Sequence, residues 1–180
     1  MIYLPFPTRP DDTTGRVVRL ATPRDLSYLV ALQNKWRHTV GFLPTQVFTR
    51  YVDAGQIAIA EENGWPVGYV NWCGTAKGIL RTIQVAVEPE MLRDKVGSSL
   101  MQIMRQFASA HELSLIRLTS RVDLQANKFW PTLGFSPTAI FKRHTQRNLP
   151  LIEWSLPLLT ADAISGVSLS TPSSQLGALS

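Results

Sequence analysis

The stretch that decides the fold runs from residue 85 to residue 100 and reads VAVEPEMLRDKVGSSL. It begins at the end of a strand-like run, ILRTIQVAV at 79–87, and leads into residues 95–111, where apolar side chains recur at helical spacing. The first N–H groups of a helix have no partner within it and point outward, so they can hold phosphate oxygens. Small residues such as Gly97 let a phosphate approach closely. The junction therefore predicts a strand, a loop and a long amphipathic helix, and taken alone the loop fits either phosphate binding or ordinary helix initiation.

A second informative stretch, ANKFWPTLGF, occupies residues 126–135. The β-rich run LIRLTS at 115–120 separates it from the long helix. Its pattern predicts a short helix over residues 125–133 that ends at Gly134 and leads into a further strand.

Together the two stretches resemble the GNAT superfamily of N-acetyltransferases. The first resembles the family's pyrophosphate loop, [RQ]-x-x-G-x-[GA] after a strand ending in V-x-P, and the second resembles A-x-x-[FL]-Y-x-x-x-G-F. Leu92 and Lys95 depart from the loop pattern at the [RQ] position and at the first glycine, and Arg93 is one position from the missing basic residue. The matching positions in the loop are Val87, Pro89, Gly97 and Leu100. The resemblance implies an α/β (α+β) GNAT fold, a mixed and mostly antiparallel central sheet flanked by helices.

The resemblance also implies that the chain binds acetyl-CoA or another acyl-CoA. The pantetheine arm would pair with the backbone of the strand, the loop would hold the pyrophosphate, and the short helix would lie beside the cofactor. The residues expected to bind it are Val85, Val87, Arg93, Asp94, Lys95, Val96, Gly97, Ser98, Asn127 and Trp130.

The reaction that the resemblance implies is direct attack of a primary amine, on a small molecule or a protein, on the acyl thioester. Trp130 stands where the family usually has the tyrosine that protonates the thiolate, and Arg81 where a glutamate base often stands. Without a base, an α-amine of pKa about 7.7–8.0 is favoured over a lysine amine of about 10.4. No catalytic residue is assigned, because each candidate substitute also fits a surface, capping or core role; the candidates are Glu88, Glu90, Asp123, Tyr51 and His144.

The rest of the chain alternates helix and strand patterns. A first strand is expected at residues 17–22, followed by a helix that Thr22 and Pro23 begin. A second helix is expected from about Leu43 to Gly55. Residues 56–73 predict a hairpin whose turn contains Asn63 and Gly64, and last strands are expected near 135–141 and 151–156. The domain boundaries expected are 1–15 for an N-terminal extension, 16–157 for the GNAT domain and 158–180 for a flexible Ser/Ala/Gly-rich tail.

Composition limits the class of protein. The 180 residues are 44% hydrophobic and 17% charged, as expected for a soluble globular domain, and no apolar run approaches the roughly 20 residues of a membrane helix. The lone Cys73 cannot form an internal disulfide or a multi-cysteine metal site. No bound metal is therefore expected, and the expected location is the cytoplasm. The chain is expected to be a monomer or a homodimer.

The net charge of +5 suggests an anionic partner, and charge alone does not choose between nucleic acid, an acidic protein and a phosphate-bearing cofactor. Two alternatives to catalysis on a simple amine therefore stay open: a degenerate GNAT domain that binds CoA or a partner without turnover, and an acyltransferase-like enzyme that modifies a nucleic-acid base. Lys142, Arg143 and Arg147 form a short basic cluster, and Trp36 and Trp72 are candidates to line an acceptor pocket.

Overall fold

The computed structural model describes residues 15–74, 77–142 and 149–158. The predicted extension before Gly15 and the tail after Leu158 lie outside the described residues, as do Arg143, His144 and Arg147.

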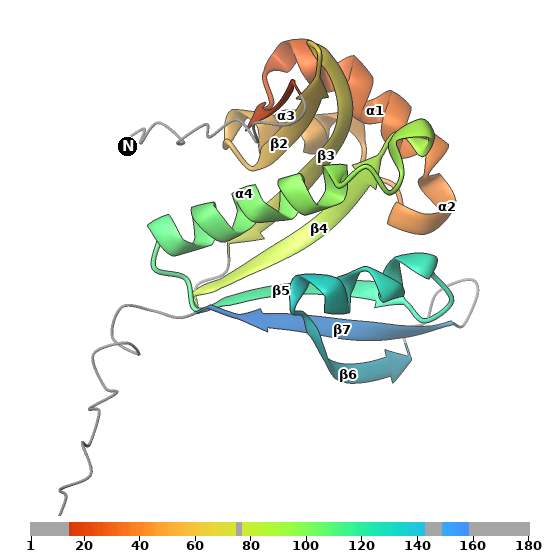
Figure 1. Ribbon diagram of the computed structural model, residues 1–180, viewed down its shortest axis with the longest axis vertical. Coiled ribbons are helices and arrows are strands. Elements are labelled where there is room, and N and C mark those ends of the chain that lie inside the picture. The colour runs from red at the N-terminus through yellow and green to blue at the C-terminus, as the bar shows by residue number, and fades with distance from the viewer. Residues whose placement is uncertain (1–14, 75–76, 143–148, 159–180) are drawn as a thin grey trace, which may run out of the picture.

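A single seven-stranded sheet organises the described residues, with strand order β1-β2-β3-β4-β5-β7-β6 (Figure 1). Every neighbouring pair is antiparallel except β4 and β5, which are parallel. This confirms the predicted mixed, mostly antiparallel sheet. The strands are β1 Arg16–Leu20, β2 Ile57–Glu62, β3 Trp65–Gly74, β4 Ile79–Val87, β5 Leu115–Arg121, β6 Ser136–Lys142 and β7 Pro150–Pro157.

Helices cover both faces of this sheet (Figure 1). On one face lies α4, Val96–Ala110, whose Leu100 and Met104 are fully buried against the sheet. On the other face lie α1 Leu26–Lys35, α2 Arg37–Val40 and α3 Thr45–Asp53, and Phe48 of α3 packs on this side. The sheet therefore separates two apolar cores. Among the described residues, no helix is long and apolar enough to cross a membrane.

Local sequence signals explain where several elements begin and turn. Asn63 and Gly64 adopt φ angles of 53° and 82°, and they form the predicted hairpin turn because Asn and Gly tolerate positive φ. Before α1, a 3₁₀ turn η1 spans Pro23–Asp25, and the Asp25 carboxylate accepts hydrogen bonds from the N–H and the hydroxyl of Thr22. The helix start predicted at Thr22 is thus present.

The segment 125–133 differs from the single short helix that the sequence predicts. It forms two 3₁₀ segments, η3 Gln125–Lys128 and η4 Trp130–Leu133, on either side of Phe129. The physical reason is Pro131, which has no N–H to continue an α-helical ladder. Gly134 ends the segment with a φ of 82°, as expected.

The parallel pair β4 and β5 is short, and this sets up the site described below. Their register joins only Ile79–Arg81 to Leu115–Arg117. Beyond Arg81 the two strands separate, as Figure 1 shows, and the pairing of β3 with β4 has a register shift nearby, between Asn71 and Trp72. The second half of β4 therefore has a free edge.

Candidate functional site

The free edge of β4 carries the two positions predicted to pair with a pantetheine arm. The N–H of Glu88 donates to the carbonyl of Val67 on β3, so by the alternation of a strand Val87 and Val85 turn their backbone groups to the opposite edge. The indole Nε1 of Trp36 already donates to the Val87 carbonyl at 2.7 Å. Trp36 therefore lies at this edge, half-buried beside the gap, and the remaining backbone groups of the edge face the gap.

The loop between β4 and α4 contains two left-handed residues, a feature of anion-binding turns. Arg93 and Lys95 adopt φ angles of 76° and 60°, a region that non-glycine residues rarely enter. Successive residues that alternate between right- and left-handed conformations turn their N–H groups toward a common point. The N–H of Asp94 donates to the Met91 carbonyl at 3.3 Å. Arg93, Asp94 and Lys95 are all exposed, so the loop is accessible from solvent.

An arginine that the sequence analysis did not single out fixes this loop. Arg16 of β1 is buried, and its guanidinium donates to the carbonyl of Asp94 at 2.6 Å and to the Glu62 carboxylate at 2.5 Å. The loop is thus tied to the far edge of the sheet. Nothing local in the sequence links residue 16 to residue 94, so only the fold brings the pair together.

The start of α4 leaves its first N–H groups available. No side chain caps the helix at Lys95, and Val96 is buried, so a contact of Val96 with a ligand would be through its backbone. Gly97 and Ser98 are partly exposed. A Cβ atom added to Gly97 would lie 3.1 Å from Cζ of Phe129, which shows that the two sequence stretches meet at this point.

Asn127 holds the second stretch against β5. Its Oδ1 accepts from the Ser120 hydroxyl at 2.6 Å, and its Nδ2 donates to the carbonyls of Arg121 and Val122. The same hydroxyl accepts from Nε1 of Trp154 at 2.9 Å. The Asn127 amide is therefore engaged in structural bonds, and a bond from it to a cofactor would replace one of them.

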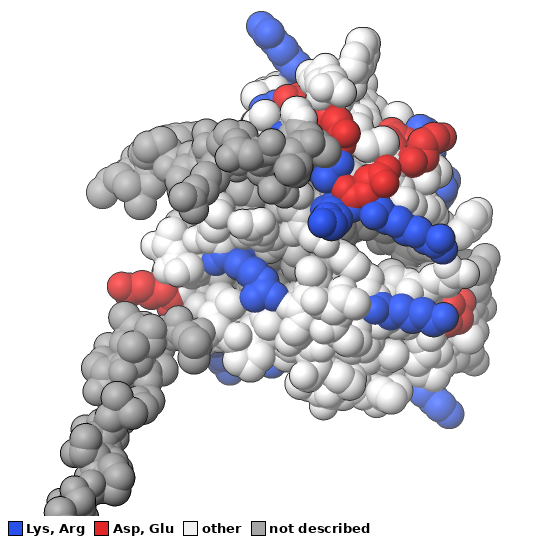
Figure 2. Space-filling model, viewed as in Figure 1, with Lys and Arg blue, Asp and Glu red and all other residues white. Residues whose placement is uncertain are grey.

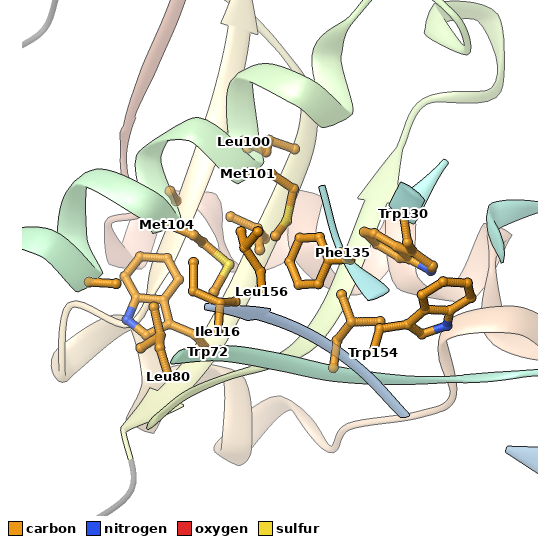
Figure 3. Close-up of a cluster of buried hydrophobic side chains, with 14 of the residues drawn as sticks. Trp72, Leu80, Leu100, Met101, Met104, Ile116, Trp130, Phe135, Trp154 and Leu156 are labelled. Carbon is orange, nitrogen blue, oxygen red and sulfur yellow. The ribbon is translucent and has the colours of Figure 1, made fainter. Parts of the chain in front are cut away.

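Two of the tryptophans considered above belong to the core (Figure 3). Trp130 packs beside Phe135 and is only 6% exposed, and its Nε1 has no hydrogen-bond partner among the described residues. Trp72 is fully buried beneath α4, next to Met104 and Leu80 in the close-up. The prediction that Trp72 lines an acceptor pocket is therefore wrong.

The candidate acids and bases are mostly engaged elsewhere. Glu88 accepts from Lys35 at 2.6 Å, and Asp123 pairs with Arg121 at 3.0 Å. Burial raises the pKa of Tyr51, so its phenol stays protonated at neutral pH. Glu90 is exposed, and His144 lies outside the described residues.

A hollow in the surface joins these parts. Figure 2 shows it between the start of α4 and the segment that holds η3 and η4, with Lys and Arg side chains on both rims and Asp and Glu side chains next to them. The hollow lies over the gap between β4 and β5, where the loop, the free strand edge and Phe129 come together. Its shape suits an elongated ligand, and the Lys and Arg side chains on its rims could meet an anionic end of that ligand.

Comparison with known proteins agrees with this geometry. Residues 53–137, which include both diagnostic stretches, match the model of the acetyltransferase (GNAT) domain. No curated protein matches the sequence.

Solved structures share the fold at low sequence identity. Ard1 from Thermoplasma volcanium aligns with a TM-score of 0.74 and 18% identity, over 81% of this chain and 99% of that chain. The ribosomal-protein-S18-alanine N-acetyltransferase from Escherichia coli aligns with a TM-score of 0.68 and 16% identity, over 81% and 96%. YncA from Salmonella typhimurium, described as a candidate acetyltransferase and solved with its cofactor acetyl-CoA, aligns with a TM-score of 0.67 and 18% identity, over 79% and 94%. By the domain match, residues 53–137 form an acetyltransferase (GNAT) domain, and the described residues share the fold of these structures.

Proposed function

We propose that residues 16–157 form an N-acyltransferase that moves an acetyl group, or a related acyl group, from its CoA thioester to a primary amine. One observation carries this proposal: an uncapped helix start, a left-handed loop and a free strand edge border the same surface hollow. The helix start and the loop suit the pyrophosphate of a nucleotide. The free strand edge suits an extended arm that carries amide groups.

The residues present fit acetyl-CoA as a substrate. The backbone of the loop from Arg93 to Ser98 would hold the pyrophosphate, with the exposed side chains of Arg93 and Lys95 adding positive charge. The amide groups of the arm would pair with the backbone of Val85 and Val87, as one strand pairs with another. When bound, acetyl-CoA supplies an activated thioester, which an amine attacks without help from a metal.

The residues of the chain would act mainly by alignment. Holding an amine beside a thioester is worth about 7–11 kcal/mol, whereas a positioned acid or base contributes about 10²- to 10⁴-fold. The indole N–H of Trp130 is a poor acid, and it has no hydrogen-bond partner among the described residues. Glu88, a candidate base, is paired with Lys35. We therefore expect a modest rate and a preference for amines that are partly unprotonated at neutral pH.

A second function, binding of CoA or of a partner without turnover, is favoured by one specific observation. Trp130 stands at the position expected to lie next to the thioester, and it is packed into the core. Its indole side chain has no hydroxyl that could protonate the leaving thiolate. Thiol release separates the two functions.

The test measures free CoA thiol with purified protein, acetyl-CoA and parallel sets of α-amino and ε-amino acceptors. The proposal predicts amine-dependent thiol release, faster with α-amines than with ε-amines at neutral pH. Binding of acetyl-CoA with no release for any amine would leave the non-catalytic function in its place. Reaction of ε-amines alone would overturn the expected preference for low-pKa amines.

A further inference from the structure

The sheet face turned away from α4 is only partly covered. On this side the helices α1 and α3 pack over Ile57, Ile59 and Tyr69 of β2 and β3. On β5, Ile116 and Leu118 point into the α4 core, so the residues that alternate with them point to the partly covered face. One of these, Thr119, is exposed, whereas Arg117 is partly buried and Arg121 donates to the His38 carbonyl of α2, so this face is open to solvent around Thr119.

Two arginines stand side by side on this open face. Arg81 of β4 and Arg117 of β5 are register partners in the parallel pair, and each alternates with a core residue, Leu80 and Ile116. Like charges directly opposite each other on neighbouring strands destabilise a sheet. The pair thus concentrates positive charge at one point of the face.

Only part of this charge is balanced within the described residues. Glu153 of β7 places Oε1 3.5 Å from Nε of Arg117, with both side chains partly buried. Arg81 is exposed and forms no ion pair within the described part of the chain. The Glu153 carboxylate therefore pairs with Arg117, and Arg81 is able to bind an anion from outside the described residues.

The position of this arginine pair relates it to the proposed reaction. Arg81 and Arg117 form the last register pair before β4 and β5 separate, so they mark the closed end of the gap. An arm that follows β4 from the loop past Val87 and Val85 leads toward that end. An acceptor held on the open face beside Arg81 would meet the arm through the gap between the strands.

We propose, building on the function proposed above, that Arg81 with its neighbour Arg117 binds the carboxylate of the acceptor, which is a small amino acid. A guanidinium and a carboxylate pair through two parallel hydrogen bonds, which fixes orientation as well as affinity. The bound carboxylate leaves the amine of the same molecule free to enter the gap. In the reaction the amine nitrogen bonds to the acyl carbon, the carbon–sulfur bond breaks, and the thiolate leaves as CoA thiol after taking up the proton that the amine loses.

Cys73 is a potentially reactive group near the pair, and it does not provide a competing explanation. It is the register partner of Arg81 on β3, and burial raises the pKa of its thiol. The protonated thiol is a poor nucleophile at neutral pH. We therefore assign Cys73 no covalent step, and Arg81 acts by binding an anion.

The test compares amino acids with their carboxamides, which keep the amine and lose the negative charge. The probes are glycine, β-alanine, L-alanine and L-glutamate, each beside its C-terminal amide, at concentrations that give equal unprotonated amine. From the typical strength of a charge-assisted hydrogen bond, kcat/KM from thiol release is expected to be about 10- to 100-fold higher for the carboxylate member of at least one pair. Comparison of glycine with β-alanine reports the spacing between amine and carboxylate that the site accepts.

Variants tie the preference to Arg81. Arg81→Gln is expected to reduce the preference below about 3-fold through KM, while acetyl-CoA affinity stays unchanged. Arg81→Lys keeps the charge without the planar fork and is expected to keep only part of the preference, which provides a second variant should Arg81→Gln fail to fold. Arg24→Gln is the matched control, because Arg24 is exposed and follows β1, which β2 and β3 separate from β4.

The outcomes separate this inference from the proposed function. Turnover of amines with equal kcat/KM for carboxylates and carboxamides would overturn the inference and leave the acyltransferase in place. A carboxylate preference that survives in Arg81→Gln would also overturn it. Acetyl-CoA binding with no turnover of any amino acid would overturn it as well, and failure of acetyl-CoA to bind would overturn both.

Discussion

Gly97 at the start of α4 lies against the ring of Phe129, so that a Cβ atom at position 97 would stand 3.1 Å from Cζ of that ring. A glycine inside a helix usually costs about 0.5–1 kcal/mol relative to alanine. Gly97→Ala is therefore expected to gain no stability, because the added methyl group must displace Phe129. The free energy of unfolding from urea titration measures this effect.

A double variant is the control for that prediction. In a Phe129→Leu background, where the ring is absent, Gly97→Ala is expected to recover the gain of about 0.5–1 kcal/mol. An equal effect of Gly97→Ala in both backgrounds would show that the contact does not constrain position 97.

Lys95 holds a left-handed conformation, with a φ of 60°, at the position where the GNAT loop has its first glycine. A left-handed conformation at a residue with a side chain lowers the stability of the fold by about 1–2 kcal/mol, and glycine avoids this cost. Glycine also makes the unfolded chain more flexible, which offsets part of the gain. Lys95→Gly is expected to be neutral to stabilising by about 1 kcal/mol and to retain acetyl-CoA binding. Lys95→Val is expected to destabilise the protein and to weaken binding more than the loss of charge in Lys95→Gly does. Thermal unfolding and calorimetric titration of both variants test this, and equal behaviour would argue against a backbone role.

Arg16 connects the loop to β1 through the Asp94 carbonyl and the Glu62 carboxylate. Removing one partner of a buried ion pair costs about 3–5 kcal/mol, since the other charge is left uncompensated. Arg16→Met is expected to lower the free energy of unfolding on that scale and to weaken acetyl-CoA binding. Arg16→Met with Glu62→Gln is expected to regain part of the stability but not the affinity, because the loop anchor is still missing. Recovery of both would show that Arg16 has no role in positioning the loop.

These features differ in how far the sequence could predict them. The strand, the loop and α4 follow from patterns within residues 79–111, and the hairpin at Asn63 follows from turn chemistry, because each depends on neighbours in the chain. Arg16 and Asp94 are 78 positions apart, and Trp36 and Val87 are 51 apart. Such contacts exist only after the sheet has formed, so no local pattern reports them.

The two tryptophans show a related limit. The sequence leaves both Trp36 and Trp72 as candidates to line an acceptor pocket, beside the core or rim packing that is usual for tryptophan. The register of β3 turns Trp72 toward α4, where it is fully buried, whereas Trp36 at the end of α1 reaches the free edge of β4. Which face a side chain takes depends on strand register, and the irregularity next to Trp72 could not be located from composition.

Acid is expected to weaken the link between β1 and α1. Hydrogen bonds from Arg19 hold the pKa of Asp25 at about 2, below its ordinary value of 3.8. Because the folded-state pKa is lowered, the ionised carboxylate stabilises the fold above the ordinary pKa, and this contribution is lost as pH falls from about 4 through about 2. Urea titrations across this range are expected to show a smaller acid loss for Asp25→Asn than for the wild-type protein. Equal acid sensitivity of the two proteins would show that Asp25 does not contribute.

The most direct measurement of the central claim is calorimetric titration of the protein with acetyl-CoA, beside CoA without the acyl group and beside a Gly97→Glu variant. The added carboxylate would stand at the start of α4 and repel phosphate, while Ser98→Ala serves as a matched conservative change in the same turn. The account predicts saturable binding of acetyl-CoA by the wild-type protein and by Ser98→Ala, and none by Gly97→Glu when that variant shows the wild-type thermal unfolding. No binding by the wild-type protein, or unchanged binding by a folded Gly97→Glu protein, would contradict the assignment of the loop as the acyl-CoA site.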